Sequence, residues 1–134
     1  WIGEYNGVSW YNDSKGTNVG ATQAAIRGTA GPVVLIAGGD GKGADFSPLA
    51  DSVRDKCRAV ILIGQDAPRL EEAIGGAAPV VHAASMREAV LCASERMLPG
   101  DSVLLSPACS SLDMFRDYQE RGTAFMDSVR ELMK

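Results

Sequence analysis

The sequence lacks the features that mark several classes of protein. Its 134 residues contain no run of ~18 apolar side chains, so no segment is expected to cross a membrane. The three cysteines are odd in number and form no C-x-x-C pair, which argues against a disulfide framework or a zinc site and favours a reducing, cytoplasmic compartment. With 13 basic and 17 acidic side chains, the net charge of −4 gives no nucleic-acid-binding footprint.

Several catalytic motifs are missing as well. His82 is the only histidine and no G-x-S-x-G is present, so a serine triad is not expected. A Walker A loop would need Ser or Thr after its lysine, but Gly43 follows Lys42. A G-x-G-x-x-G fingerprint counted from Gly39 fails at Ala44. The acidic residues near these positions are too dispersed to predict a metal site.

What the sequence does contain is a regular alternation of strands and helices. Asn6-Gly7 between two short β patterns predicts an antiparallel hairpin. The later strand patterns include continuous apolar runs, which are typical of strands buried on both faces of a parallel sheet. The expected strands are 2–5, 8–11, 33–37, 59–63, 79–82 and 102–105. The pattern predicts an α/β fold: one doubly wound, Rossmann-like, mostly parallel sheet with one antiparallel edge hairpin strand, helices on both faces, and a single domain over 1–134.

The helix boundaries are predicted from capping residues. The expected helices are 19–27, one opening at 47–48, 66–74, 86–98, and a last one from the residues after 113 to the end. Ser47 is expected as an N-cap with Pro48 at the first helical position. Ser85 and Glu88 have the spacing of a capping box. Gly122 is expected to break or kink the last helix.

Three polar loops follow strands at what should be one edge of the sheet: the first loop (12–18), the second loop (38–43) and the third loop (106–113). Ligands of such sheets bind beyond the carboxyl ends of the strands. The first loop precedes a helix and carries an acid, a lysine, hydroxyls and amides, which suits an anion site. The alternative is an ordinary polar loop with Asn18 or Thr17 as N-cap.

Each of the other two loops also has two interpretations. The second loop holds four glycines that would let a ligand approach closely, with Lys42 as a point charge, or it is a tight turn with a solvated lysine. Cys109 in the third loop could be a nucleophile, but a small buried thiol is the commoner case. Arg116 and Arg121 should lie on the last helix, where a solvated face is expected for both unless the site reaches them.

Three motifs in register carry a resemblance to a known family. They are N-D-S-K-x-T-N at 12–18, G-G-D-G-K at 38–42 and L-L-S-P-A-C-x-S-x-D at 104–113, followed by E-R-G at 120–122. The chain resembles the C-terminal domain of the Mur ligases, in the branch that adds D-glutamate to UDP-N-acetylmuramoyl-L-alanine. The aspartate-asparagine-proline-arginine motif of the branch that adds diaminopimelate or lysine is absent.

The resemblance implies a three-domain enzyme of peptidoglycan precursor synthesis. A UDP-binding domain and a central ATPase domain that holds most of the ATP and Mg²⁺ contacts would lie outside this chain. With its start at Trp1, the chain is therefore expected to be a fragment that is inactive alone. In the family, ATP phosphorylates the substrate carboxylate and the amine of D-glutamate attacks the acyl phosphate, giving ADP. A cytoplasmic monomer without nucleic-acid or membrane partners is expected.

The resemblance also assigns residues. Asp13, Lys15 and Thr17 would contact the nucleotide. D-glutamate would be held by Thr17, Lys42, Ser111, the Leu112 backbone and Tyr118. No catalytic or metal residue is assigned. Two positions depart from the family, which has phenylalanine at Tyr118 and usually alanine at Gly16. The alternative is a stand-alone nucleotide-binding module that uses the same loops.

Overall fold

The computed structural model describes residues 1–14, 17–41, 43–109 and 115–133. They form a six-stranded sheet in the order β1-β2-β6-β3-β4-β5. The strands are β1 Gly3–Tyr5, β2 Val8–Asn12, β3 Val33–Gly38, β4 Cys57–Ile63, β5 Val80–His82 and β6 Ser102–Leu105. The helices of this part of the chain are α1 Val19–Gly28, α2 Leu49–Lys56, α3 Ala67–Ile74, α4 Met86–Arg96 and α5 Tyr118–Leu132.

The edge hairpin is confirmed. β1 pairs antiparallel with β2, and the other strand pairs are parallel. Asn6 and Gly7 have φ angles of 52° and 77°, the positive values that a type I′ turn requires at both central positions. The Asn-Gly pair thus sets the register of the hairpin.

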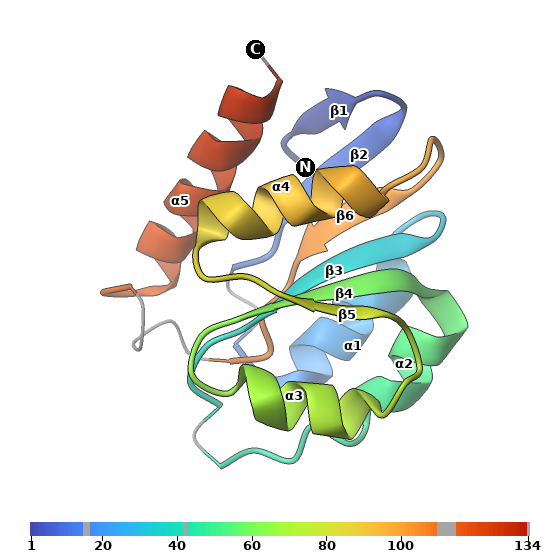
Figure 1. Ribbon diagram of the computed structural model, residues 1–134, viewed down its shortest axis with the longest axis vertical. Helices are drawn as coiled ribbons and strands as arrows, with labels where there is room; N and C mark the ends of the chain where they lie inside the picture. Colours follow the sequence, from blue (N-terminus) through green and yellow to red (C-terminus); the bar gives the residue numbers. More distant parts are fainter. Residues whose placement is uncertain (15–16, 42, 110–114, 134) are drawn as a thin grey trace.

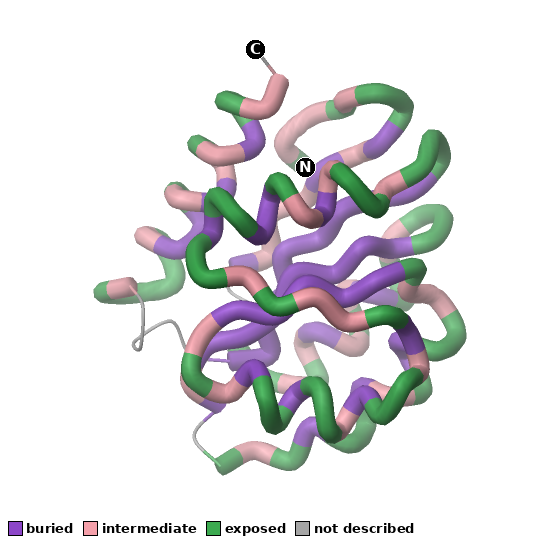
Figure 2. The backbone as a smooth tube through the Cα atoms, viewed as in Figure 1, coloured by how far each residue is buried: buried purple, intermediate pink, exposed green. Residues whose placement is uncertain are grey.

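Helices cover both faces of the sheet, as expected for a doubly wound fold (Figure 1). Helices α1, α2 and α3 pack on one face, and α4 and α5 on the other. β3 shows why its sequence is apolar throughout: Val33 and Leu35 join the first core, whereas Val34 and Ile36 join the second. Figure 2 shows the consequence, with buried central strands and helices exposed on their outer sides.

Two capping predictions have different outcomes. Ser85 caps α4 as expected, because its hydroxyl accepts a hydrogen bond from the Glu88 backbone N–H at 3.1 Å. The Ser47 prediction is wrong: Pro48 takes the N-cap position of α2. Ser47 instead donates from its backbone N–H to the Asp45 carboxylate at 3.0 Å. Backbone and side-chain hydrogen bonds from Ser47 lower the pKa of Asp45, so this serine stabilises the turn before the helix.

The last helix also differs from expectation. It begins at Tyr118 and continues to Leu132, so Gly122 neither breaks it nor ends it. A Cβ atom at Gly122 would lie 2.9 Å from Asn12 Nδ2 and 3.2 Å from Ser14 Cβ. Even the smallest side chain would therefore crowd the first loop, because the helix lies against it.

Candidate functional site

The three polar loops lie side by side because their strands are neighbours. β6 pairs with β2 on one side and with β3 on the other. Hydrogen bonds extend this pairing into the loops, from Asp13 N to Leu105 O at 2.8 Å and from Gly38 N to Pro107 O at 3.0 Å. The third loop therefore begins between the other two.

Arg121 joins all three loops. It is 1% exposed and lies in the first turn of α5. Its guanidinium donates to the carbonyl oxygens of Ser14 at 2.9 Å, Cys109 at 2.9 Å and Gly38 at 3.5 Å. Its Nε also donates to the Ser14 hydroxyl at 3.2 Å. Arg121 therefore does not lie on a solvated face, because its planar donor set is hydrogen-bonded to oxygens of the three loops.

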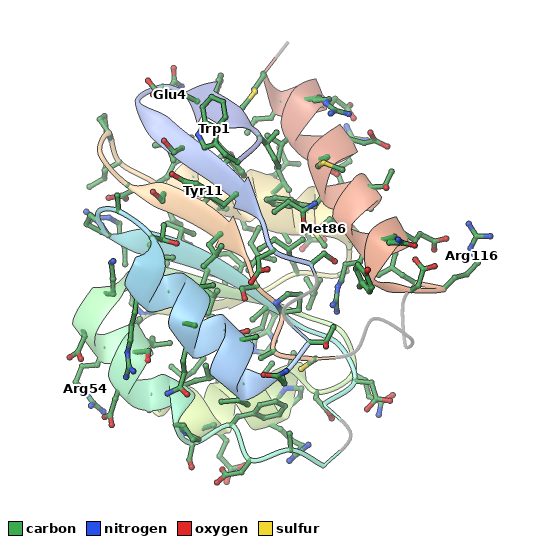
Figure 3. All side chains as sticks on the ribbon, turned by 180° about the vertical axis from the view of Figure 1, so that it is seen from behind. Trp1, Glu4, Tyr11, Arg54, Met86 and Arg116 are labelled. Atoms are coloured by element: carbon green, nitrogen blue, oxygen red, sulfur yellow. The ribbon has the colours of Figure 1, made fainter. Side chains whose placement is uncertain are left out.

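Helical spacing was the signal that could have revealed Arg121. Phe125 and Val129, four and eight residues later, are both buried. Arg121 begins this stripe, so its side chain faces the sheet. Arg116 behaves as expected for a solvated residue, although it precedes the helix: it pairs with Glu120 at 2.6 Å and points away from the protein (Figure 3).

Asp13, assigned by resemblance to the nucleotide, has a well-defined environment. Its side chain is partly exposed, and one carboxylate oxygen accepts a hydrogen bond from Ser106 Oγ at 3.0 Å. The same Ser106 hydroxyl lies 3.0 Å from Thr22 Oγ1 on α1. Both hydroxyl-bearing residues are 0% exposed. The Asp13 carboxylate is therefore held by the buried Ser106 hydroxyl, which in turn contacts the buried Thr22 hydroxyl.

Thr17 and Tyr118 lie near the first loop in different ways. Thr17 is exposed and precedes Asn18, whose side chain caps α1 by accepting from Ala21 N at 2.9 Å. Tyr118 is 39% exposed, and its carbonyl oxygen accepts from the Ser14 hydroxyl at 2.6 Å. A cavity of about 260 Å³ lies here, lined by Asn12, Ser14, Tyr118, Gln119, Gly122, Thr123 and Met126.

The second loop is fastened to α3. Gly41 N donates to Asp66 Oδ2 at 2.7 Å, and Asp66 N donates to Gly39 O at 2.9 Å. Gly38 has a φ of 133°, and a Cβ atom there would lie 1.8 Å from the carbonyl oxygen of Ile63. At Gly38, therefore, it is the neighbouring strand β4 that approaches the glycine closely.

Four of the assigned residues, Lys15, Lys42, Ser111 and Leu112, lie outside the described residues, as does Gly16. Described residues flank them in the sequence. Ser14 precedes Lys15, and Cys109 is the last described residue before 110–114. Both contact Arg121 through their carbonyl oxygens. The structure thus brings together the supports of the first and third loops.

Two further candidates have other roles. His82 lies away from the three loops and pairs with Glu71 at 3.0 Å, and each of these side chains is about half exposed. Cys109 in the third loop has a buried side chain, as expected, and Cys57, Cys92 and Cys109 form no disulfide. Within the described ranges, no three His, Cys, Asp or Glu side chains are grouped so that they could hold a metal ion. None of the helices described here has the length and apolar character needed to cross a membrane.

Curated relatives match nearly the whole chain. It is 56% identical to the UDP-N-acetylmuramoylalanine–D-glutamate ligase of Nitrosococcus oceani, over 99% of this chain and 30% of the relative. The ligases of the same name from Aromatoleum aromaticum and Pseudomonas aeruginosa are 59% and 54% identical, over 95% and 98% of this chain. The chain spans 28% and 30% of the length of these two relatives.

A solved structure supports the fold, and a family model supports the family. The structure is of a domain described as part of a UDP-N-acetylmuramate:L-alanyl-gamma-D-glutamyl-meso-diaminopimelate ligase from Haemophilus ducreyi. Its TM-score is 0.53 at 17% identity, covering 98% of this chain and 93% of that one, so it supports the fold. The family described as "Mur ligase, glutamate ligase domain" matches residues 1–109. The chain belongs to the Mur ligase family, as its glutamate ligase domain.

Proposed function

We propose that this chain is the C-terminal domain of a three-domain, ATP-dependent ligase that adds D-glutamate to UDP-N-acetylmuramoyl-L-alanine. The observation that carries the proposal is that Arg121 donates hydrogen bonds to all three polar loops and so holds them together. The names of the relatives, at 54% to 59% identity, supply the reaction. The full enzyme would act in cytoplasmic peptidoglycan precursor synthesis as a monomer, and would release ADP and phosphate.

The two sides of the site have different tasks. Asp13, Lys15 and Thr17 are proposed to face the nucleotide. Lys42, Ser111, the Leu112 backbone and Tyr118 are proposed to hold D-glutamate, with Thr17 shared between both ligands. D-glutamate carries two carboxylates, and charge-assisted hydrogen bonds from a lysine and from hydroxyls match them. Arg121 is buried and held by loop carbonyls, so its role is to keep these loops together.

Most of the contacts to ATP and to Mg²⁺ are assigned to the central domain. ATP would supply the phosphoryl group that activates the alanine carboxylate of the UDP substrate. Toward the nucleotide, Asp13 offers one carboxylate whose orientation is restricted by the Ser106 hydroxyl. The residues of this chain would orient the amine of D-glutamate and exclude water when the domains close.

Lys42→Ala in the ligase that contains this chain tests the amino-acid side. We expect the KM for D-glutamate to rise by orders of magnitude, because the side-chain carboxylate loses its cation. The KM for ATP should change much less. The matched control is Lys56→Ala, since Lys56 donates to the backbone carbonyls of Arg27 and Thr29 at the other end of the sheet. An unchanged KM for D-glutamate in Lys42→Ala would rule out the assignment.

The isolated chain provides a second test. We expect it to release no ADP in a D-glutamate-dependent manner, because the phosphate loop lies in another domain. Ligand-observed NMR with D-glutamate, L-glutamate and ADP would show whether the chain alone binds either substrate. Tight binding of ADP with no preference for D-glutamate would support the stand-alone nucleotide module instead.

A further inference from the structure

Two buried hydroxyls, of Ser106 and Thr22, lie next to the first loop. Ser106 is the first residue after β6, and Thr22 lies in the first turn of α1; both are 0% exposed. Their oxygens are 3.0 Å apart, and Thr22 Oγ1 is also 3.2 Å from the Ser106 carbonyl oxygen. Buried hydroxyls require hydrogen-bond partners, and this pair ends at Asp13.

The three contacts fix the direction of the hydrogen bonds. A carboxylate only accepts, so the single proton of the Ser106 hydroxyl is donated to Asp13 Oδ2. The Thr22 proton must then be donated to Ser106, at its hydroxyl or its carbonyl oxygen. Asp13 thus accepts from the Ser106 hydroxyl, and Ser106 in turn accepts the Thr22 proton at one of its two oxygens.

The backbone of Asp13 is fixed by the same strand. Its N–H donates to Leu105 O at 2.8 Å, one residue before Ser106. Because the main chain and the carboxylate of Asp13 are held by consecutive residues at the end of β6, the orientation of its side chain is restricted. Neutral hydroxyls do this without cancelling the charge of the carboxylate, so it keeps its strength as an acceptor.

We propose that Ser106 and Thr22 are positioning residues for the nucleotide, because their hydroxyls set the direction of the Asp13 carboxylate. The inference rests on the proposed function, from which it takes the contact between Asp13 and the nucleotide. The two hydroxyls themselves are buried and touch no ligand. Their effect should therefore appear in the affinity for nucleotide and leave D-glutamate binding intact.

Ser106→Ala and Thr22→Val in the ligase that contains this chain provide the test. We expect Ser106→Ala to raise the KM for ATP about tenfold, the effect of losing one hydrogen bond to a charged group, and Thr22→Val to raise it less, because Thr22 acts through Ser106. Thr22→Ser keeps the hydroxyl and should restore the original KM. The matched control is Ser102→Ala at the other end of β6, where a 3% exposed serine donates to Ala30 O at 2.8 Å. It should leave the KM for ATP and for D-glutamate unchanged.

Two outcomes would overturn the inference. One is an unchanged KM for ATP in both variants; the other is a joint rise of the KM values for ATP and D-glutamate, which would indicate a merely structural role. If Ser106→Ala does not fold, the comparison of Thr22→Val with Thr22→Ser decides alone.

A separate measurement distinguishes this failure from failure of the proposed function. An active wild-type ligase must release ADP in a D-glutamate-dependent manner, and its failure to do so would reject the proposed function. The ¹³C resonance of the Asp13 carboxylate in this chain needs no activity. It should move in Ser106→Ala and stay in place in Ser102→Ala; an unmoved resonance in Ser106→Ala would reject the support of Asp13 itself.

Discussion

Arginines brace both ends of the sheet, but they join different things. At the carboxyl ends of the strands, Arg121 is 1% exposed and donates to carbonyl oxygens of three loops. At the amino ends, Arg58 makes two hydrogen bonds to the Asp101 carboxylate, at 2.6 and 3.0 Å. The first arginine holds segments that carry candidate ligand groups. The second closes an ion pair between the starts of two strands.

The difference shows that positive charge alone does not mark the functional end. A cavity of about 470 Å³ at the amino ends is lined by Arg54, Lys56 and Arg58, among others. Each of these cations already has a partner within the protein: Arg54 pairs with Asp51, Lys56 with backbone carbonyls and Arg58 with Asp101. At the carboxyl ends, the buried arginine stabilises the loops, and partly exposed or exposed groups such as Asp13 and Thr17 face outward.

The largest effect is expected from Arg121→Met. The variant keeps the apolar length of the side chain but leaves the loop carbonyls without their donor, which should cost about 3 kcal/mol of unfolding free energy. Because the three loops lose their common partner, the KM values for D-glutamate and ATP should rise together. Chemical denaturation of the chain and kinetics of the ligase that contains it measure the two effects.

Arg58→Met is the matched control for this prediction. It should also lower stability, because the buried Asp101 carboxylate loses its cation, but both KM values should stay as in the wild type. Arg121→Lys should recover little, since one ammonium group cannot reproduce the planar donor set. Equal effects of Arg58→Met and Arg121→Met on the KM values would abolish the distinction between the two ends.

A smaller effect on stability is expected from Gly122→Ala. Alanine gains about 1 kcal/mol of helix propensity over glycine, but its Cβ would crowd Asn12 and Ser14. The two terms oppose each other, so the unfolding free energy should change by less than about 1 kcal/mol. The displaced first loop should nevertheless bind its ligands severalfold more weakly, as measured by NMR titration or by KM.

Gly20→Ala on α1 is the control for Gly122. A Cβ atom at Gly20 would meet only Asn18 Oδ1, at an ordinary distance of 3.6 Å. This variant should gain stability and keep ligand affinity. If Gly122→Ala also keeps full affinity, the contact between α5 and the first loop does not matter for binding.

The parts of the fold that local chemistry determines were predictable from the sequence. Asn6-Gly7 specifies its own turn, Ser85 and Glu88 specify their own cap, and strands such as β3 are apolar on both faces. The three loops were predictable for the same reason, since each follows a recognisable strand. The order of strands was not, and it is the insertion of β6 between β2 and β3 that places the loops together.

The supports of the site were missed because they depend on distant residues. Arg121 and Ser14 are 107 residues apart, and Ser106 and Thr22 are 84 apart. No local pattern pairs them. The Ser47 prediction failed for a local reason. A serine can cap a helix or take part in a turn, and here Ser47 forms the turn with Asp45 and does not cap α2.

The smallest effect at neutral pH is expected at the amino ends of the strands, where Cys57 begins β4. Burial raises the pKa of the Cys57 thiol from 9.0 to about 12, although neighbouring Lys56 opposes the shift. Unfolded chains release this proton first as the pH rises, so Cys57 should contribute stability that is present below pH 9 and is lost toward pH 12. Denaturation of the wild type and of Cys57→Ala at several pH values isolates this contribution from that of other titrating groups.

The same thiol gives a chemical measure of how closed the amino end is. At pH 9, iodoacetamide should modify Cys57 far more slowly in the native chain than in the unfolded chain, because the thiolate is the reactive form. Mass spectrometry of the modified peptides separates Cys57 from Cys92, which lies on α4. Modification of Cys57 at the unfolded rate would mean that the amino end is open to small reagents. The contrast between the two ends of the sheet would then rest on Arg121 alone.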